Sequence, residues 1–268
     1  MTSAQKLKLC VLGRDDSYTR MIVQSLLVRN LNFTLVLEKN SRTRSRIERL
    51  LERPLALYRA LTSGRFKALP AFSWFKLRTF IEEQIYKRSF ASRAIFDSLK
   101  NVPMDGIIVP SINHVFTLKL IERKQFDIGL FAGVDIVDGA IINAFSKICL
   151  NAHPAPLPQC RGGGALINTL YQNLKPAASV HIATAEIDAG EILRVSNLPL
   201  QKDDSYNSIE LRLTLLCADI LAEEALELSR GKLINGTPNN GELHYWKECT
   251  LERQRAAMRR LQKMLQEL

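Results

Sequence analysis

The stretch LKLCVLG at residues 7–13 is a continuous apolar run that ends in glycine, which is typical of a buried strand in a parallel sheet. Apolar residues at helical spacing follow over residues 19–28, and FTLVLEK at residues 33–39 is a second apolar run. The chain therefore opens with a strand, a helix and a strand. This order predicts an α/β protein with a doubly wound, mostly parallel sheet, whose ligands bind at the carboxyl ends of the strands.

The same alternation resumes beyond residue 100. Further strands are predicted at residues 105–110, 126–133, 146–150, 179–185 and 191–200. Helices are predicted at residues 114–124 and 137–145. After residue 200 we expect a helix capped by Asp203 or Asp204 and ending near Arg230. A hairpin with its turn near Asn240 and Gly241, and a last helix over residues 251–268, complete the expected chain.

Residues 41–100 interrupt this rhythm and predict a basic helical insertion. Apolar residues recur there at helical spacing, broken by Pro54, Gly64 and Pro70. Between residues 41 and 95, 13 Lys or Arg face four Glu, so this segment carries nearly all of the net charge of +10. Such a segment favours phosphate groups, nucleic acid or an anionic membrane as a partner. The alternative, of equal weight, is that these charges lie on solvated helix faces and bind no partner.

Composition limits the class of protein. The 268 residues are 46% hydrophobic and 24% charged, as in a soluble globular protein of one large domain or of one domain with an appendage. No apolar run approaches the roughly 20 residues of a spanning helix, and MTSAQKLKLCVLG lacks a signal region, so we expect a cytoplasmic protein. The five cysteines form no CxxC pair, which indicates reduced, mostly buried thiols and neither a disulfide framework nor a metal site.

Three polar residues stand at the ends of predicted strands. Asn151 and His153 lie in LNAHPAPLPQCRGGG at residues 150–164 and point to the same side, because strand side chains alternate. Asp188 lies in the sharp turn EIDAG. An amide donor, a histidine and a carboxylate together suit acyl transfer. A Cys160–His153 nucleophile pair is the rival hypothesis, although it matches no nucleophile motif, and a structural role for the histidine stays open.

Two stretches resemble the folate-dependent formyltransferase family, which includes glycinamide ribonucleotide transformylase, methionyl-tRNA formyltransferase and the sugar N-formyltransferases. LNAHPAPLPQCRGGG is similar to the family's Asn-x-His-Pro followed by Leu-Pro and Arg-Gly, and SVHIATAEIDAGEIL at residues 179–193 is similar to its Val-His segment ending in Asp-x-Gly. The two motifs occur in the family's order, and the similarity is clearest over residues 105–200.

The resemblance implies a Rossmann-like formyltransferase domain over residues 1–200, with the insertion at about 41–100 and a C-terminal extension over 201–268. It implies transfer of a formyl group from 10-formyltetrahydrofolate to an uncharged amine, without a metal. Asn151 and His153 would stabilise the oxyanion, and Asp188 would orient His153 and help remove the amine proton. The residues implied in folate binding are Phe131, Gly133, Val134, Asp135, Ile136, Glu186 and Ile187.

Two features in which the sequence departs from members of the family indicate which amine accepts the formyl group. The turn GRDDSYTR after the first strand has one glycine and two acids, unlike the glycine-rich phosphate turn of the ribonucleotide enzymes. Only 68 residues follow Leu200, too few for the long helix and β-barrel domain of the tRNA enzyme. We therefore expect the amino sugar of a nucleotide sugar, with substrate-binding arginines at Arg42, Arg44, Arg46 and Arg161.

Several alternatives stay open at the level of sequence. The acceptor alternatives are methionyl-tRNA, which would make RNA a partner, and a hydroxylamine of siderophore synthesis. Formyltetrahydrofolate hydrolysis and a non-catalytic binding module are the alternatives of other classes, and a homodimer is a further open partner. His181 is expected to be a packed, hydrogen-bonded histidine, with a place in the site as the alternative, while His114 and His244 are expected to be structural.

Overall fold

The computed structural model describes residues 7–39, 90–240, 245–246 and 250–268. The chain divides into two units, residues 1–39 with 96–268 and residues 40–95. The first unit contains the sheet. Helix α4 (Phe90–Lys100) begins in the second unit and ends in the first.

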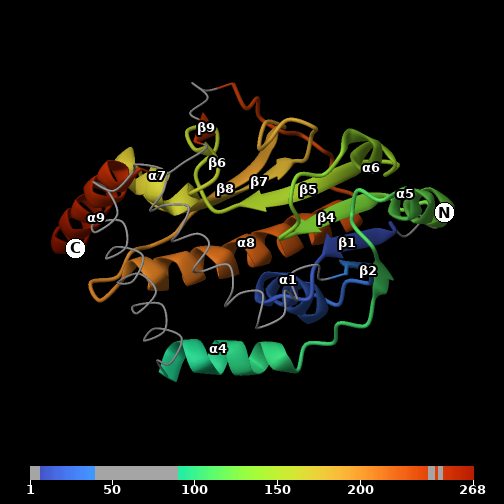
Figure 1. The fold of residues 1–268 in the computed structure, drawn as a ribbon, viewed down its shortest axis with the longest axis horizontal. Helices are drawn as coiled ribbons and strands as arrows, with labels where there is room; N and C mark the ends of the chain where they lie inside the picture. Colours follow the sequence, from blue (N-terminus) through green and yellow to red (C-terminus); the bar gives the residue numbers. More distant parts are fainter. Residues whose placement is uncertain (1–6, 40–89, 241–244, 247–249) are drawn as a thin grey trace, which may run out of the picture. The chain divides into compact units, whose positions relative to one another are not determined.

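Seven strands form one sheet in the order β3-β2-β1-β4-β5-β7-β8, which confirms the predicted α/β class (Figure 1). β1 pairs in parallel with both β2 and β4, and the sheet stays parallel as far as β5. β5 then pairs antiparallel with β7, and β7 with β8. The strands are β1 (Leu9–Gly13), β2 (Phe33–Glu38), β3 (Ile107–Val109), β4 (Ile128–Ala132), β5 (Ile148–His153), β7 (Ala177–Ile182) and β8 (Ile192–Asn197).

Helices cover both faces of the sheet, which explains why its central strands are apolar throughout. Cys10 and Leu12 of β1 share a buried cluster with Ile121 of α5 and Ile141 of α6. On the other face α8 lies across β5 and β7 and contacts α1 (Figure 1). These helices are α1 (Ser17–Val28), α5 (Val115–Lys124), α6 (Gly139–Asn143) and α8 (Tyr206–Ser229). None of the helices among the described residues is long and apolar enough to cross a membrane.

The C-terminal helices build a second, smaller cluster of buried residues. Leu170 of α7 (Ala165–Tyr171) and Leu261 of α9 (Leu251–Gln266) pack there with Ile209 near the start of α8. The cap of α8 differs from the prediction: Ser205, and not Asp203 or Asp204, accepts the Ser208 backbone N–H. Asp204 pairs instead with Arg212, so its carboxylate is engaged about two turns further on.

The hairpin expected after α8 stays a prediction. Within the described residues, Thr237 pairs with Ile192 of β8, and β9 (Tyr245–Trp246) pairs in parallel with β6 (Arg161–Gly162). Both pairings join the segment to parts of the chain that are distant in sequence. Gly241 of the predicted turn lies outside the described residues.

The cysteines within the described residues are free and buried, as predicted: Cys10, Cys149, Cys160 and Cys217. Burial raises the pKa of each of these thiols, to about 12 for Cys149. They are therefore neutral packing residues at physiological pH. Cys249 lies outside the described residues.

The return from β7 to β8 is so tight that Gly190 admits no side chain. A Cβ atom there would overlap the carbonyl oxygen of Ile182. We predict that Gly190→Ala lowers the free energy of unfolding by about 1–3 kcal/mol, the usual cost of forcing atoms into a packed site. Gly139→Ala is the matched control, because the nearest heavy atom to its new Cβ would be 3.7 Å away. Urea unfolding of both variants checks this, and equal stability of the two would contradict it.

Candidate active site

The antiparallel pairing of β5 with β7 brings polar residues of distant segments together. Asn151 of β5 lies directly opposite His181 of β7, and the Asn151 Nδ2 is 3.1 Å from the His181 Nε2. His153 follows two residues later on the same face of β5, opposite Ser179. The buried Ser179 hydroxyl donates to the Ala155 carbonyl, which fixes the loop that leaves this strand.

Asp188 lies between the two histidines. Its Oδ2 is 3.4 Å from the His153 Nδ1, and its Oδ1 is 3.4 Å from the His181 Nε2. The Gly162 backbone N–H, from β6, donates to Oδ2 over 3.0 Å. Asp188 itself has a φ of +48°, a left-handed conformation that is unusual for a residue with a side chain. The carboxylate is therefore aimed by a turn that the surrounding contacts hold in place.

Backbone carbonyls decide where the histidines carry their protons. The His153 Nε2 is 3.0 Å from the Cys160 carbonyl, and the His181 Nδ1 is 2.9 Å from the Ile182 carbonyl. A carbonyl only accepts, so these nitrogens are the ones that bear hydrogen. The other nitrogen of each ring, the His153 Nδ1 and the His181 Nε2, faces the Asp188 carboxylate.

The pKa values show how burial and charge compete in this cluster. Burial lowers the pKa of His153, and the neighbouring Asp188 opposes that shift. Burial alone would raise the pKa of Asp188, but the hydrogen bond with His181, the proximity of His153 and the Gly162 N–H hold it at about 2. The carboxylate is therefore ionised at neutral pH.

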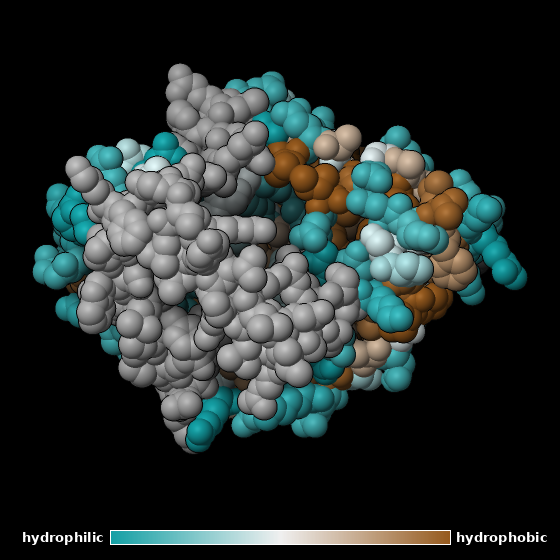
Figure 2. All heavy atoms as spheres, viewed as in Figure 1, coloured by the Kyte–Doolittle hydropathy of each residue, from teal (hydrophilic) through white to brown (hydrophobic). Residues whose placement is uncertain are grey.

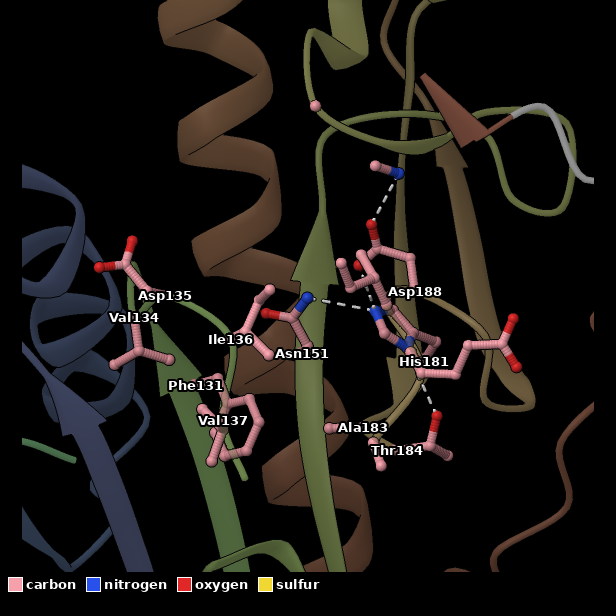
Figure 3. A pocket seen from close by; sticks show the side chains of 15 residues that line it. Phe131, Val134, Asp135, Ile136, Val137, Asn151, His181, Ala183, Thr184 and Asp188 are labelled. Carbon is pink, nitrogen blue, oxygen red and sulfur yellow. Dashed lines mark hydrogen bonds and ion pairs between the residues drawn. The ribbon is translucent and has the colours of Figure 1, made fainter. Parts of the chain in front are cut away.

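A cleft of about 530 Å³ opens beside these groups (Figure 3). Asn151, His181 and Asp188 lie on one side of it, and Phe131, Val134 and Val137 on the other. The residues that line it are Phe131, Val134, Asp135, Ile136, Val137, Asn151, Gly162, Gly163, His181, Ala183, Thr184, Ala185, Glu186, Ile187 and Asp188.

Most residues predicted for folate binding line this cleft. Gly133 is the exception: it has a φ of +65° and turns the chain at the end of β4 without lining the cleft. His153 is buried and does not line the cleft either. The Arg161 guanidinium donates to the Ile187 carbonyl and pairs with Glu186 over 2.9 Å, so it holds the loop before Asp188. Arg42, Arg44 and Arg46 lie outside the described residues.

The structure decides two points that the sequence left open. His181 is 2% exposed and hydrogen-bonded, as expected, and it also lines the cleft, which was the alternative. The Cys160–His153 nucleophile pair is contradicted, because His153 contacts the Cys160 carbonyl and not its thiol. The thiol instead accepts from the Gln172 Nε2 over 2.9 Å.

A family model described as formyl transferase matches residues 127–226, which include both motifs and the cleft. The methionyl-tRNA formyltransferase of Geobacillus sp. is 28% identical over 125 residues, which cover 43% of this chain and 39% of that relative. The corresponding protein of Rickettsia typhi is 31% identical over 109 residues, which cover 40% of this chain and 36% of the relative. The chain thus matches less than half of the length of these curated relatives.

Solved structures share the fold over most of the chain. A sugar N-formyltransferase from Shewanella sp superposes with a TM-score of 0.58 at 12% identity, covering 96% of this chain and 88% of that one. Glycinamide ribonucleotide transformylase 1 from Symbiobacterium toebii gives a TM-score of 0.54 at 18% identity, over 87% of this chain and 92% of that one. A sugar 3N-formyl transferase, solved in the presence of dTDP and 5-N-formyl-THF, gives 0.53 at 12% identity, over 97% and 80%. Residues 127–226 thus match the formyl transferase family, and solved formyltransferases share the fold of the chain.

Proposed function

We propose that the chain transfers a formyl group from 10-formyltetrahydrofolate to a primary amine. The observation that carries the proposal is the ionised Asp188 between two histidines, with the Asn151 amide beside them at the end of a cleft. These groups supply an oxyanion donor and a proton acceptor, the two requirements of acyl transfer to an amine. They lie within the region that the formyl transferase model matches.

The apolar wall of the cleft supports the folate part of the proposal. Phe131, Val134 and Val137 line it, and Ile136 beside them is 65% exposed. Apolar side chains also gather on part of the described surface in Figure 2. A flat pterin that packs against this wall would bury apolar surface, and this burial stabilises the complex by roughly 25 cal/mol per Å². The cleft volume of about 530 Å³ lies within the usual range of cofactor sites.

In the proposed reaction an uncharged amine attacks the formyl carbon. The new C–N bond forms as the bond from that carbon to N10 of the folate breaks, and the proton lost by the amine balances the one that N10 gains. The Asn151 amide donates to the developing oxyanion, and Asp188 accepts the amine proton, directly or through water. His153 is buried, so it acts through Asp188 by orienting the carboxylate.

For the acceptor we propose the amino sugar of a nucleotide sugar. The Asp16 carboxylate caps α1 by accepting the Thr19 backbone N–H over 2.9 Å, so an acid occupies the place where a glycine-rich turn would hold phosphate. This disfavours glycinamide ribonucleotide. The basic segment with Arg42, Arg44 and Arg46 supplies charge for a diphosphate. Methionyl-tRNA is the second candidate, because the curated relatives act, by name, on that acceptor.

Removal of the hydrogen-bond donor to the oxyanion, Asn151, or of the proton acceptor, Asp188, should strongly reduce turnover without unfolding the protein. We expect Asn151→Ala to lower kcat by about 10²–10³, the cost of one oxyanion donor, and Asp188→Asn to lower it at least as much. Cys160→Ala is the matched control and should keep the wild-type kcat, because its thiol faces Gln172. Single-turnover release of tetrahydrofolate measures all three. A near-wild-type rate in either site variant, or loss of activity in the control, would contradict the mechanism.

The mechanism needs Asp188 to be ionised at working pH, and its lowered pKa makes this testable through stability. A carboxylate whose native pKa is about 2, against an ordinary 3.8, stabilises the fold fully above pH 4. That contribution is lost as the pH falls from 4 to 2. We therefore expect the difference in unfolding free energy between the wild type and Asp188→Asn to be constant above pH 5 and to shrink below pH 4. Urea unfolding over a pH series measures it, and a difference that changes between pH 6 and 7 would contradict the assignment.

A panel of acceptors separates the proposed function from its alternatives. Tetrahydrofolate release is expected to need an amino-sugar nucleotide, and Arg42→Ala, Arg44→Ala and Arg46→Ala together should raise the KM of that acceptor without changing folate binding. Release that needs methionyl-tRNA, or a hydroxylamine, would move the assignment to that acceptor. Release without any amine would identify a hydrolase, and folate binding without release a binding module.

A further inference from the structure

Asn239 reaches the Asp188 turn from the segment after α8, beyond the matched residues 127–226. Asn239 is buried, with 7% of the residue exposed. The Nδ2 donates to the Asp188 carbonyl over 2.8 Å and to the Gly190 carbonyl over 3.0 Å. One side-chain amide therefore ties both ends of the turn that carries the carboxylate.

The chemistry of these contacts requires an amide at this position. Both partners are carbonyl oxygens, so a hydrogen-bond donor must face them, and the two N–H groups of one side-chain amide can serve both. The Oδ1 of Asn239 is buried and has no hydrogen-bond partner among the described residues. Burying an unsatisfied oxygen costs free energy that an apolar side chain of the same size would avoid. Packing alone thus does not account for asparagine here, whereas donation to the turn does.

The turn that Asn239 ties is one that would otherwise relax. A left-handed φ of +48° at a residue with a Cβ persists only when its surroundings hold it. On the opposite side Gly162 binds the carboxylate and Arg161 binds the Ile187 carbonyl. The carboxylate direction follows from the backbone conformation, so a relaxed turn would move it away from His153 and His181.

The segment that carries Asn239 is itself fixed to the edge of this site. Thr237 and Ile192 exchange backbone hydrogen bonds of 2.8 and 2.9 Å. Further along, β9 pairs with β6, the strand that contains Arg161 and Gly162. The C-terminal extension therefore contacts the Asp188 turn on one side and the strand across from it on the other.

We propose that Asn239 is a positioning residue of the active site. Its amide holds the left-handed turn and so aims the Asp188 carboxylate at the two histidines. The inference rests on the proposed function, because it assigns Asn239 an effect that passes through Asp188. It also makes the C-terminal extension part of the reaction site, and not only a covering of the sheet.

A double-mutant cycle tests the proposal with the full-length chain. Asn239→Ala should lower kcat roughly 10- to 100-fold, the scale expected when a catalytic group is displaced by about an ångström, while the KM for the folate changes little. In the Asp188→Asn background the same substitution should cause no further loss, because the group that it positions is already gone. Asn235→Ala, at an exposed asparagine of the same segment, is the matched control and should leave kcat unchanged.

Asn239→Asp sharpens the test, because it keeps the volume but replaces the donor by an acceptor. It should lose at least as much kcat as Asn239→Ala, and it serves in the same cycle if the alanine variant does not fold. Wild-type kcat in Asn239→Asp, or an equal fractional loss with and without Asp188, would overturn the positioning role. If Asp188→Asn alone keeps full turnover, the proposed function fails instead, which separates the two failures.

Discussion

The structure is organised around a buried carboxylate that must stay charged. Asp188 would be neutral at a higher pH if burial acted alone, yet the hydrogen bond with His181, the adjacent His153 and the Gly162 N–H hold its pKa at about 2. Each of these partners comes from a different part of the chain, and each must lie within a few ångströms of the carboxylate. The pairing of β5 with β7, the short strand β6 and the segment at Asn239 all meet this requirement.

The charged carboxylate also determines which reaction step the site can carry out. An ionised carboxylate can accept a proton from an attacking amine. Backbone carbonyls fix the outer nitrogens of both rings as donors, and the inner nitrogens face Asp188. The cleft joins this polar end to an apolar wall, which suits a ligand with one reactive end and one flat, apolar body.

Sequence predicted the sheet well because buried parallel strands appear as continuous apolar runs, as in β1 and β4. It also named Asn151, His153 and Asp188, which the structure brings together. It did not assign His181 to the site, since a single strand does not reveal which strand it pairs with or in which register. The described pairings of the segment after α8 were missed for the same reason: turn residues are local signals, whereas Thr237 and β9 pair with partners far away in the sequence.

The most direct test of the central claim is a crystal structure of the protein with a non-transferring analogue of 10-formyltetrahydrofolate. We expect the pterin to pack against Phe131, Val134 and Val137. The formyl oxygen should lie within hydrogen-bond distance of the Asn151 Nδ2, and Asp188 should lie beside the formyl carbon. Such a complex would join the apolar wall and the polar cluster in one reacting geometry. An analogue bound elsewhere, or bound in the cleft with its formyl group turned away from Asn151 and Asp188, would contradict the account.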